Sequence, residues 1–179
     1  VVISATGLQP KMILPIMKIT VAVLTAFQGS HHVSKFMDKI TFGTYLKRIK
    51  NPKSPFDWLT VNEENIQKYL ADDLCGFTFT LNGFKTLAGL CTGLYDTDKI
   101  EAMPKELPML FLYGDEDPVG EYGKAVEKSY QMYVDAGMQQ VSKITYPGKR
   151  HELLHEDNKL DVMRDIYAWI QRMILKQQC

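Results

Sequence analysis

Three apolar segments of the chain have the pattern of buried β-strands. Residues 107–114, LPMLFLYG, form an apolar run bounded by Pro108 and Gly114, which is typical of a strand buried on both faces of a parallel sheet. Residues 141–148, VSKITYPG, predict a second strand that ends at a Pro-Gly turn. Residues 1–7, VVISATG, predict a core strand that runs into a turn.

Apolar residues at helical spacing follow each of the last two strands. After the first strand, the pattern comprises Tyr122, Val126, Tyr130 and Tyr133, and Gly137 suits the end of that helix. After the second strand, it comprises Leu160, Met163, Ile166, Ile170 and Ile174, with Asp157 or Asn158 placed to cap the helix. Strand, helix, strand, helix with short links predicts an α/β fold with βαβ topology, in which functional groups collect at the carboxyl ends of the strands.

The segment before residue 100 has a different pattern of predicted secondary structure, in which helices alternate with loops rich in Gly, Pro and Asn. Its most apolar stretch, residues 12–27, is interrupted by Pro15 and Lys18. The stretch is shorter than the roughly 20 residues of a membrane span, and it lacks the cleavage site of a signal peptide. We therefore expect a helix with one apolar face.

Composition narrows the class of protein. A chain of 179 residues that is 45% hydrophobic and 23% charged is ordinary for one soluble globular domain. The net charge of zero argues against a nucleic-acid partner.

The chain has three cysteines, Cys75, Cys91 and Cys179, and none of them forms a C-x-x-C pair. We therefore expect neither a disulfide framework nor a cysteine zinc site, and we expect a cytoplasmic location. The first residues, Val1-Val2, lack an initiator methionine, which suggests a cropped or processed chain.

A carboxylate and an imidazole follow the last two predicted strands. Asp117 lies in GDEDPVG after the first strand, and His151 lies in YPGKRHE after the second. An acid followed by a histidine is the second half of a Ser…Asp…His relay, in which the imidazole takes a proton from the nucleophile and a buried carboxylate fixes its tautomer. Pro118 holds Asp117 in an extended loop, and Asp115 is a competing carboxylate in the same loop.

These motifs carry a resemblance to a known family. LPMLFLYGDEDPVG, ITYPGKRHELLHE and DIYAWI resemble the C-terminal end of an α/β-hydrolase of the monoacylglycerol lipase and lysophospholipase group, whose bacterial members carry close versions of all three. Upstream, FGTYLKRIKNP, PFDWLT and DDLCGFTFT resemble the cap of those bacterial members. The resemblance implies a partial α/β-hydrolase fold: residues 1–7 as a core strand, 8–100 as a mainly helical cap, and 101–179 as the C-terminal part of the core.

The resemblance also implies an activity. Asp117 would be the triad acid, because the family pattern places the acid directly before Pro-Val, and His151 would be the general base. The parent protein would be a serine carboxylic-ester hydrolase that acts on a lipid ester and needs no cofactor or metal. The nucleophile motif G-x-S-x-G is absent. We therefore expect this chain alone to be inactive, and to need an N-terminal half supplied by a longer chain, a partner fragment or association with another copy.

Two further motifs suggest other nucleophiles or ligands. Residues 151–155, HELLH, fit the H-E-x-x-H zinc motif. A zinc peptidase needs a continuous helix and a third ligand, whereas Pro147 and Gly148 interrupt the chain just before it, and no histidine follows His155 and no glutamate follows Glu156. Cys91, in GLCTG, follows a helical pattern instead of the strand that a nucleophile elbow requires. We expect a small buried cysteine there.

Other features of the presumed cap leave alternatives open. The basic run comprises Lys47, Arg48, Lys50 and Lys53, which would form a solvated face or make transient contact with an anionic membrane surface. The aromatic residues Phe56, Trp58, Phe77 and Phe79 would belong to the core, and some would also line an acyl pocket. His155 alone is expected to be a solvated or capping histidine, and His31-His32 to lie in a polar loop. A non-catalytic lipid-binding or interaction module on the same scaffold is the alternative function.

Overall fold

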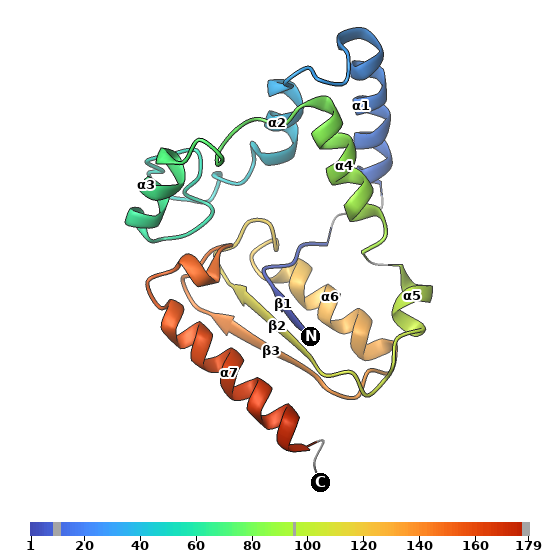
Figure 1. Ribbon diagram of the computed structural model, residues 1–179, viewed down its shortest axis with the longest axis vertical. Coiled ribbons are helices and arrows are strands. Elements are labelled where there is room, and N and C mark those ends of the chain that lie inside the picture. Colours follow the sequence, from blue (N-terminus) through green and yellow to red (C-terminus); the bar gives the residue numbers. More distant parts are fainter. Residues whose placement is uncertain (9–11, 95, 177–179) are drawn as a thin grey trace.

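Three parallel strands form the sheet of the protein (Figure 1). The computed structural model describes residues 1–8, 12–94 and 96–176. The strands are β1 (Val2–Ser4), β2 (Met109–Gly114) and β3 (Val141–Tyr146), with β2 in the centre. Every residue of β2 is buried, which confirms the prediction of a strand covered on both faces.

Two helices cover the two faces of the sheet. On one face, α6 (Lys124–Asp135) follows β2 and packs on Met109, Phe111 and Tyr113. On the other face, α7 (Lys159–Lys176) packs on Leu110 and Leu112. Successive side chains of a strand point to opposite faces, so the apolar run of β2 supplies both cores at once. The predicted order of strand, helix, strand, helix is confirmed.

Most of the residues predicted to form the apolar face of α7 do not pack on the sheet. Leu160, Met163, Ile170 and Ile174 are between 38% and 67% exposed. The face that packs on the sheet is made of Val162, Ile166, Trp169 and Met173, so only Ile166 is shared. Both sets recur at intervals of three or four residues and have the same helical periodicity. The pattern therefore predicted the helix but could not decide which stripe meets the sheet.

The N-terminus of α7 also differs from the prediction that a side chain of Asp157 or Asn158 caps it. The carbonyl of Asn158 accepts hydrogen bonds from the N–H groups of Asp161 and Val162. The side-chain oxygen of Asn158, however, is buried and has no hydrogen-bond partner among the described residues. Asp157 instead pairs with Lys149.

A helical segment lies between β1 and β2 in the sequence; its first four helices lie beyond the carboxyl ends of the strands, and its last helix lies beside α6 (Figure 1). It comprises α1 (Ile13–Gln28), α2 (Lys35–Phe42), α3 (Glu63–Ala71), α4 (Leu81–Thr92) and α5 (Thr97–Glu101). The N-termini of α2, α3 and α4 are fixed by the side chains of Ser34, Asn62 and Thr80, each of which accepts a hydrogen bond from the backbone N–H three residues later.

The helical segment has its own apolar core. Val21 of α1, Met37 of α2, and Leu81 and Phe84 of α4 are buried together. This cluster confirms that residues 12–27 supply a helix with a packed apolar face. A second set of apolar side chains on α1 is exposed and comprises Ile16, Ile19, Val23 and Phe27, so the expectation of a single apolar face is wrong. None of the described helices has the length and apolarity to cross a membrane.

Candidate active site

The ends of β2 and β3 bring Asp117 and His151 together. The Nδ1 atom of His151 lies 3.0 Å from the Oδ2 atom of Asp117. The side chain of Asp117 is fully buried, and that of His151 is 26% exposed. An imidazole held through Nδ1 by a buried carboxylate has its Nε2 atom available for proton transfer. The structure thus joins the two residues that the strand order placed at the same edge.

The backbone of the acid loop is joined to the backbone of the histidine loop. Gly114 ends β2, and a Cβ atom there would lie 2.1 Å from the carbonyl oxygen of Lys149, so only glycine allows this close approach. Two residues further on, the N–H of Glu116 donates to the same carbonyl at 2.9 Å. The Oδ1 atom of Asp117 accepts from the N–H of Val119 at 2.8 Å. Both oxygens of the Asp117 carboxylate are therefore held.

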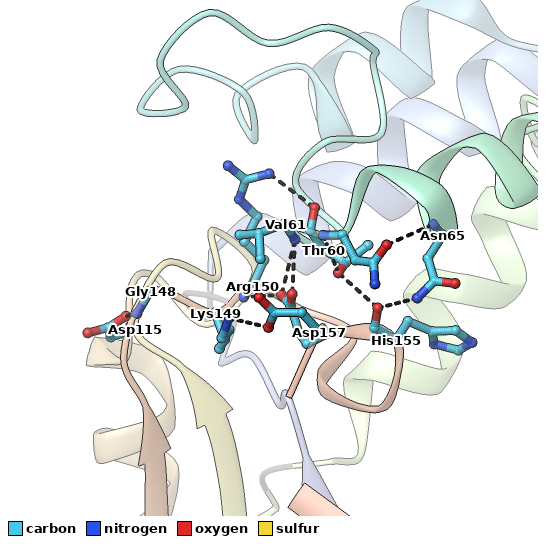
Figure 2. Close-up of polar contacts among 11 residues, drawn as sticks. Thr60, Val61, Asn65, Asp115, Gly148, Lys149, Arg150, His155 and Asp157 are labelled. Atoms are coloured by element: carbon cyan, nitrogen blue, oxygen red, sulfur yellow. Dashed lines mark hydrogen bonds and ion pairs between the residues drawn. The ribbon is translucent and has the colours of Figure 1, made fainter. Parts of the chain in front are cut away.

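Asp115, the competing carboxylate, has a different partner. Its Oδ1 atom accepts from the N–H of Gly148 at 2.6 Å, in the Pro-Gly turn that ends β3 (Figure 2). Asp115 is exposed, whereas Asp117 contacts the imidazole. Geometry therefore separates two acids that stand two residues apart in the sequence.

Aromatic residues of the helical segment pack next to His151. The ring of Trp58 lies 5.4 Å from the His151 ring, centroid to centroid. Tyr45 in turn packs edge-on against Trp58 at 5.0 Å. Burial, and after it the negative charge of Asp117, raises the pKa of Tyr45 to about 12, so its hydroxyl is neutral at pH 7. The sequence named Trp58 as a core or pocket residue but gave no signal for Tyr45 or for the contact with His151.

A network of hydrogen bonds joins the loop that carries His151 to the segment that carries Trp58 (Figure 2). At its centre is Glu156, whose carboxylate is fully buried and accepts from the N–H groups of Val61 and Arg150. The guanidinium of Arg150 donates to the carbonyls of Asp57 and Thr60. Sequence reasoning missed Glu156, because no local pattern distinguishes a buried glutamate from a solvated one.

One residue of the basic run, Arg48, contacts the turn that follows Asp117. The guanidinium of Arg48 lies over the ring of Tyr122, 3.6 Å from its centroid. Tyr122 and the preceding Glu121 have positive φ angles of 57° and 51°, which are unusual for side chains of this size. The N–H of Tyr122 donates to the carbonyl of Asp117 at 2.8 Å. Arg48 therefore packs on the turn that follows the acid and is not merely part of a solvated face.

The H-E-x-x-H motif does not lie on a continuous helix. His151 lies in a loop, and Leu153–His155 form a single turn of 3-10 helix. The Nδ1 atom of His151 contacts Asp117, and that of His155 lies 3.2 Å from Glu152. The side chain of His155 is mostly exposed, as expected for a solvated histidine. Among the described residues, no group of three or more His, Cys, Asp or Glu side chains is placed to hold a metal ion.

Cys91 lies in the last turn of α4. The helix before it confirms the predicted helical pattern and rules out the strand-to-helix turn of a nucleophile elbow at this position; the side chain is only partly buried, and not buried as expected. Burial raises the pKa of the Cys91 thiol, which disfavours the reactive thiolate.

A parallel sheet with helices on both faces, an acid and a histidine after successive strands, and a helical segment inserted after β1 define part of an α/β-hydrolase fold. The chain belongs to the Hydrolase_4 family, described as Serine aminopeptidase, S33, whose model matches residues 1–158. Comparison with curated proteins finds no significant match.

Solved structures show the same fold at low sequence identity. A thermostable carboxyl esterase from Bacillus coagulans is 22% identical with a TM-score of 0.84, over 97% of this chain and 56% of that one. A lipase in an open form is 20% identical with a TM-score of 0.78, over 96% and 56%. A monoacylglycerol lipase from Paleococcus ferrophilus is 15% identical with a TM-score of 0.57, over 96% and 58%. This chain thus spans little more than half the length of each of these three structures.

Proposed function

We propose that the protein to which this chain belongs is a serine hydrolase of carboxylic esters, with Asp117 and His151 as the acid and base of its triad. The observation that carries the proposal is the 3.0 Å contact between the His151 Nδ1 and the fully buried Asp117 carboxylate. Membership of a serine hydrolase family supports it. The esterase and lipases with the same fold support the ester as the bond that is cleaved.

His151 would act as the proton carrier of the reaction. Its Nε2 would accept the proton of a serine hydroxyl as that oxygen attacks the acyl carbonyl, and would return the proton to the departing alcohol. Asp117 would hold the imidazole through Nδ1 and stabilise the imidazolium. We propose that the serine, and the backbone amides that bind the oxyanion, lie outside residues 1–179. The chain alone would then have no nucleophile for His151 to activate.

We further propose a lipid ester, a monoacylglycerol or a lysophospholipid, as the substrate, and residues 8–100 as a cap over the site. The position of Trp58 beside His151 supports this, since the aromatic ring brings an apolar surface to the edge of the catalytic pair. The exposed apolar side chains of α1, Ile16, Ile19, Val23 and Phe27, are a second apolar surface in the same segment. They would also suit a lipid-binding module without catalysis, which is the competing function.

The test is hydrolysis by the longest form of the protein that can be expressed. Monooleoylglycerol, lysophosphatidylcholine and p-nitrophenyl butyrate would be compared with alanine p-nitroanilide, which separates esters from aminopeptidase substrates. We expect ester hydrolysis that His151→Gln abolishes and that His31→Gln, an exposed loop substitution, leaves intact. Hydrolysis unaffected by His151→Gln would overturn the proposal. Robust turnover by the 179-residue chain alone would overturn the external serine.

A further inference from the structure

The environment of Glu156 identifies a residue that the proposed reaction does not use directly. Its side chain is fully buried. Oε1 accepts from the N–H of Arg150 at 2.8 Å and from the N–H of Val61 at 3.2 Å, and Oε2 accepts from the same Val61 N–H at 3.1 Å. A buried carboxylate is costly unless its oxygens are bonded, and here one carboxylate holds two backbone segments that are about ninety residues apart in the sequence.

Four more hydrogen bonds join the same two segments, residues 57–61 and 150–156, and one of them runs from the Arg150 guanidinium to the carbonyl of Asp57. The N–H of Glu152 donates to the carbonyl of Leu59 at 2.7 Å. The Thr60 hydroxyl donates to the carbonyl of His155 at 3.1 Å, and the Arg150 guanidinium donates to the Thr60 carbonyl at the same distance (Figure 2). Leu59 and Thr60 are buried, so these bonds are partly shielded from competing water.

The two joined segments carry two aromatic rings that pack against each other. Trp58 lies within the first segment and His151 within the second, and their centroids are 5.4 Å apart. The N–H that Glu156 binds in the second segment belongs to Arg150, the residue directly before His151. That N–H belongs to the peptide group between Lys149 and Arg150, so the bond restrains the backbone that leads directly into His151.

We propose that Glu156 is a positioning residue of the active site: its buried carboxylate fixes residues 57–61 on the histidine loop, and so sets the place of both Trp58 and the His151 ring. The inference rests on the proposed function only for its catalytic readout, because the coupling of the two segments can be measured without activity. Glu156 does not touch substrate or move a proton; it acts through His151.

The experiment compares Glu156→Gln with the matched control Asp157→Asn in the longest form of the protein. Glutamine keeps one acceptor oxygen but replaces the other with an NH2 group, which would face an N–H donor. Asp157 is the adjacent residue and is mostly exposed, and its carboxylate pairs with Lys149 and not with residues 57–61. Two quantities are measured: ester hydrolysis as separate kcat and KM values, and backbone hydrogen exchange resolved by peptide.

We expect Glu156→Gln to lower kcat by about 10- to 100-fold with KM within about twofold, because a small misplacement of a catalytic group costs that much. Hydrogen exchange should rise in residues 57–61 and 150–156 and stay unchanged in β2 and α6. Asp157→Asn should change neither quantity. A general loss of stability would instead raise exchange throughout the chain.

Each of the other possible results would contradict one part of the proposal. Unchanged kcat in Glu156→Gln, together with an inactive His151→Gln, would overturn the positioning role and leave the proposed function standing. No ester hydrolysis by any form would overturn the proposed function, and exchange that does not rise in the two segments would then overturn the coupling itself. If Glu156→Gln does not fold, Thr60→Val is used instead, because it removes one bond between the same segments. Hydrogen exchange should then rise in residues 57–61 and 150–156, by a smaller amount.

Discussion

Asp115 and Asp117 stand two residues apart, yet their carboxylates bind different loops and only one of them meets the imidazole. Asp117 Oδ2 lies 3.0 Å from His151 Nδ1, whereas Asp115 Oδ1 accepts from the N–H of Gly148 at 2.6 Å. One acid is therefore placed to orient a histidine, and the other fixes the turn after β3.

This difference predicts unequal effects of the same substitution. Asp117→Asn should reduce kcat for ester hydrolysis by about 10⁴-fold, because an amide favours the wrong imidazole tautomer. Asp115→Asn keeps an oxygen that can accept from Gly148 and should stay within about threefold of the wild type. Steady-state kinetics of both variants decide the matter, and equal losses would contradict the assignment of the acid.

The geometry of residues 151–155 predicts that hydrolysis is independent of zinc. His155 is exposed and paired with Glu152, so His155→Ala should leave activity within about twofold, as for an ordinary surface change. Incubation with 1,10-phenanthroline should likewise leave the rate unchanged. Loss of activity in either experiment, with recovery on adding Zn²⁺, would restore the metal hypothesis.

The contact of Arg48 with Tyr122 predicts a difference between two neighbouring basic residues. Arg48→Ala should lower the free energy of unfolding by about 0.5–1 kcal/mol, the usual size of an exposed cation–π contact. Lys47→Ala, an exposed residue in the same run, should change it by less than about 0.5 kcal/mol. Urea unfolding of both variants measures the difference, and a Lys47 effect as large as that of Arg48 would refute the assignment.

The pair formed by Glu127 of α6 and Lys143 of β3 predicts a pH dependence of stability. The hydrogen bond from Lys143, and after it the one from the Tyr113 hydroxyl, holds the pKa of Glu127 below its ordinary value of 4.5. A lowered pKa stabilises the fold above that ordinary value, and the contribution is lost as the pH falls through the lower folded value. Glu127 is partly exposed, so the contribution should stay below about 1 kcal/mol.

The stability difference between wild type and Glu127→Gln should thus be larger at pH 7 than at pH 3. Urea unfolding at both pH values measures it. Lys143→Met serves as the control, because the variant lacks the ammonium group and should weaken the pH dependence. A stability difference between the two proteins that grows toward acidic pH would contradict the predicted direction of the pH dependence.

The core of the fold was predictable because its signals are local. Each strand of the sheet has its pattern within about eight residues, and α6 and α7 follow from helical periodicity. Parallel strands joined by helices place their carboxyl ends at one edge, so a contact between His151 and an acid of the loop after β2 could be expected from the order of elements, and the family resemblance favoured Asp117 over Asp115. The extent of the cap and the activity of the whole protein remain proposals.

The sequence by itself therefore determined the three strands, the helices α6 and α7, and the placement of His151 and an acid of the preceding loop at the same edge of the sheet. Tertiary structure decided which stripe of α7 meets the sheet, which of two nearby acids meets His151, and that Glu156 and Trp58 adjoin the histidine loop. The reason is physical: periodicity records which residues are apolar within a few turns, whereas these contacts join segments up to 95 residues apart. Such contacts exist only once the chain has folded, and no local pattern encodes them.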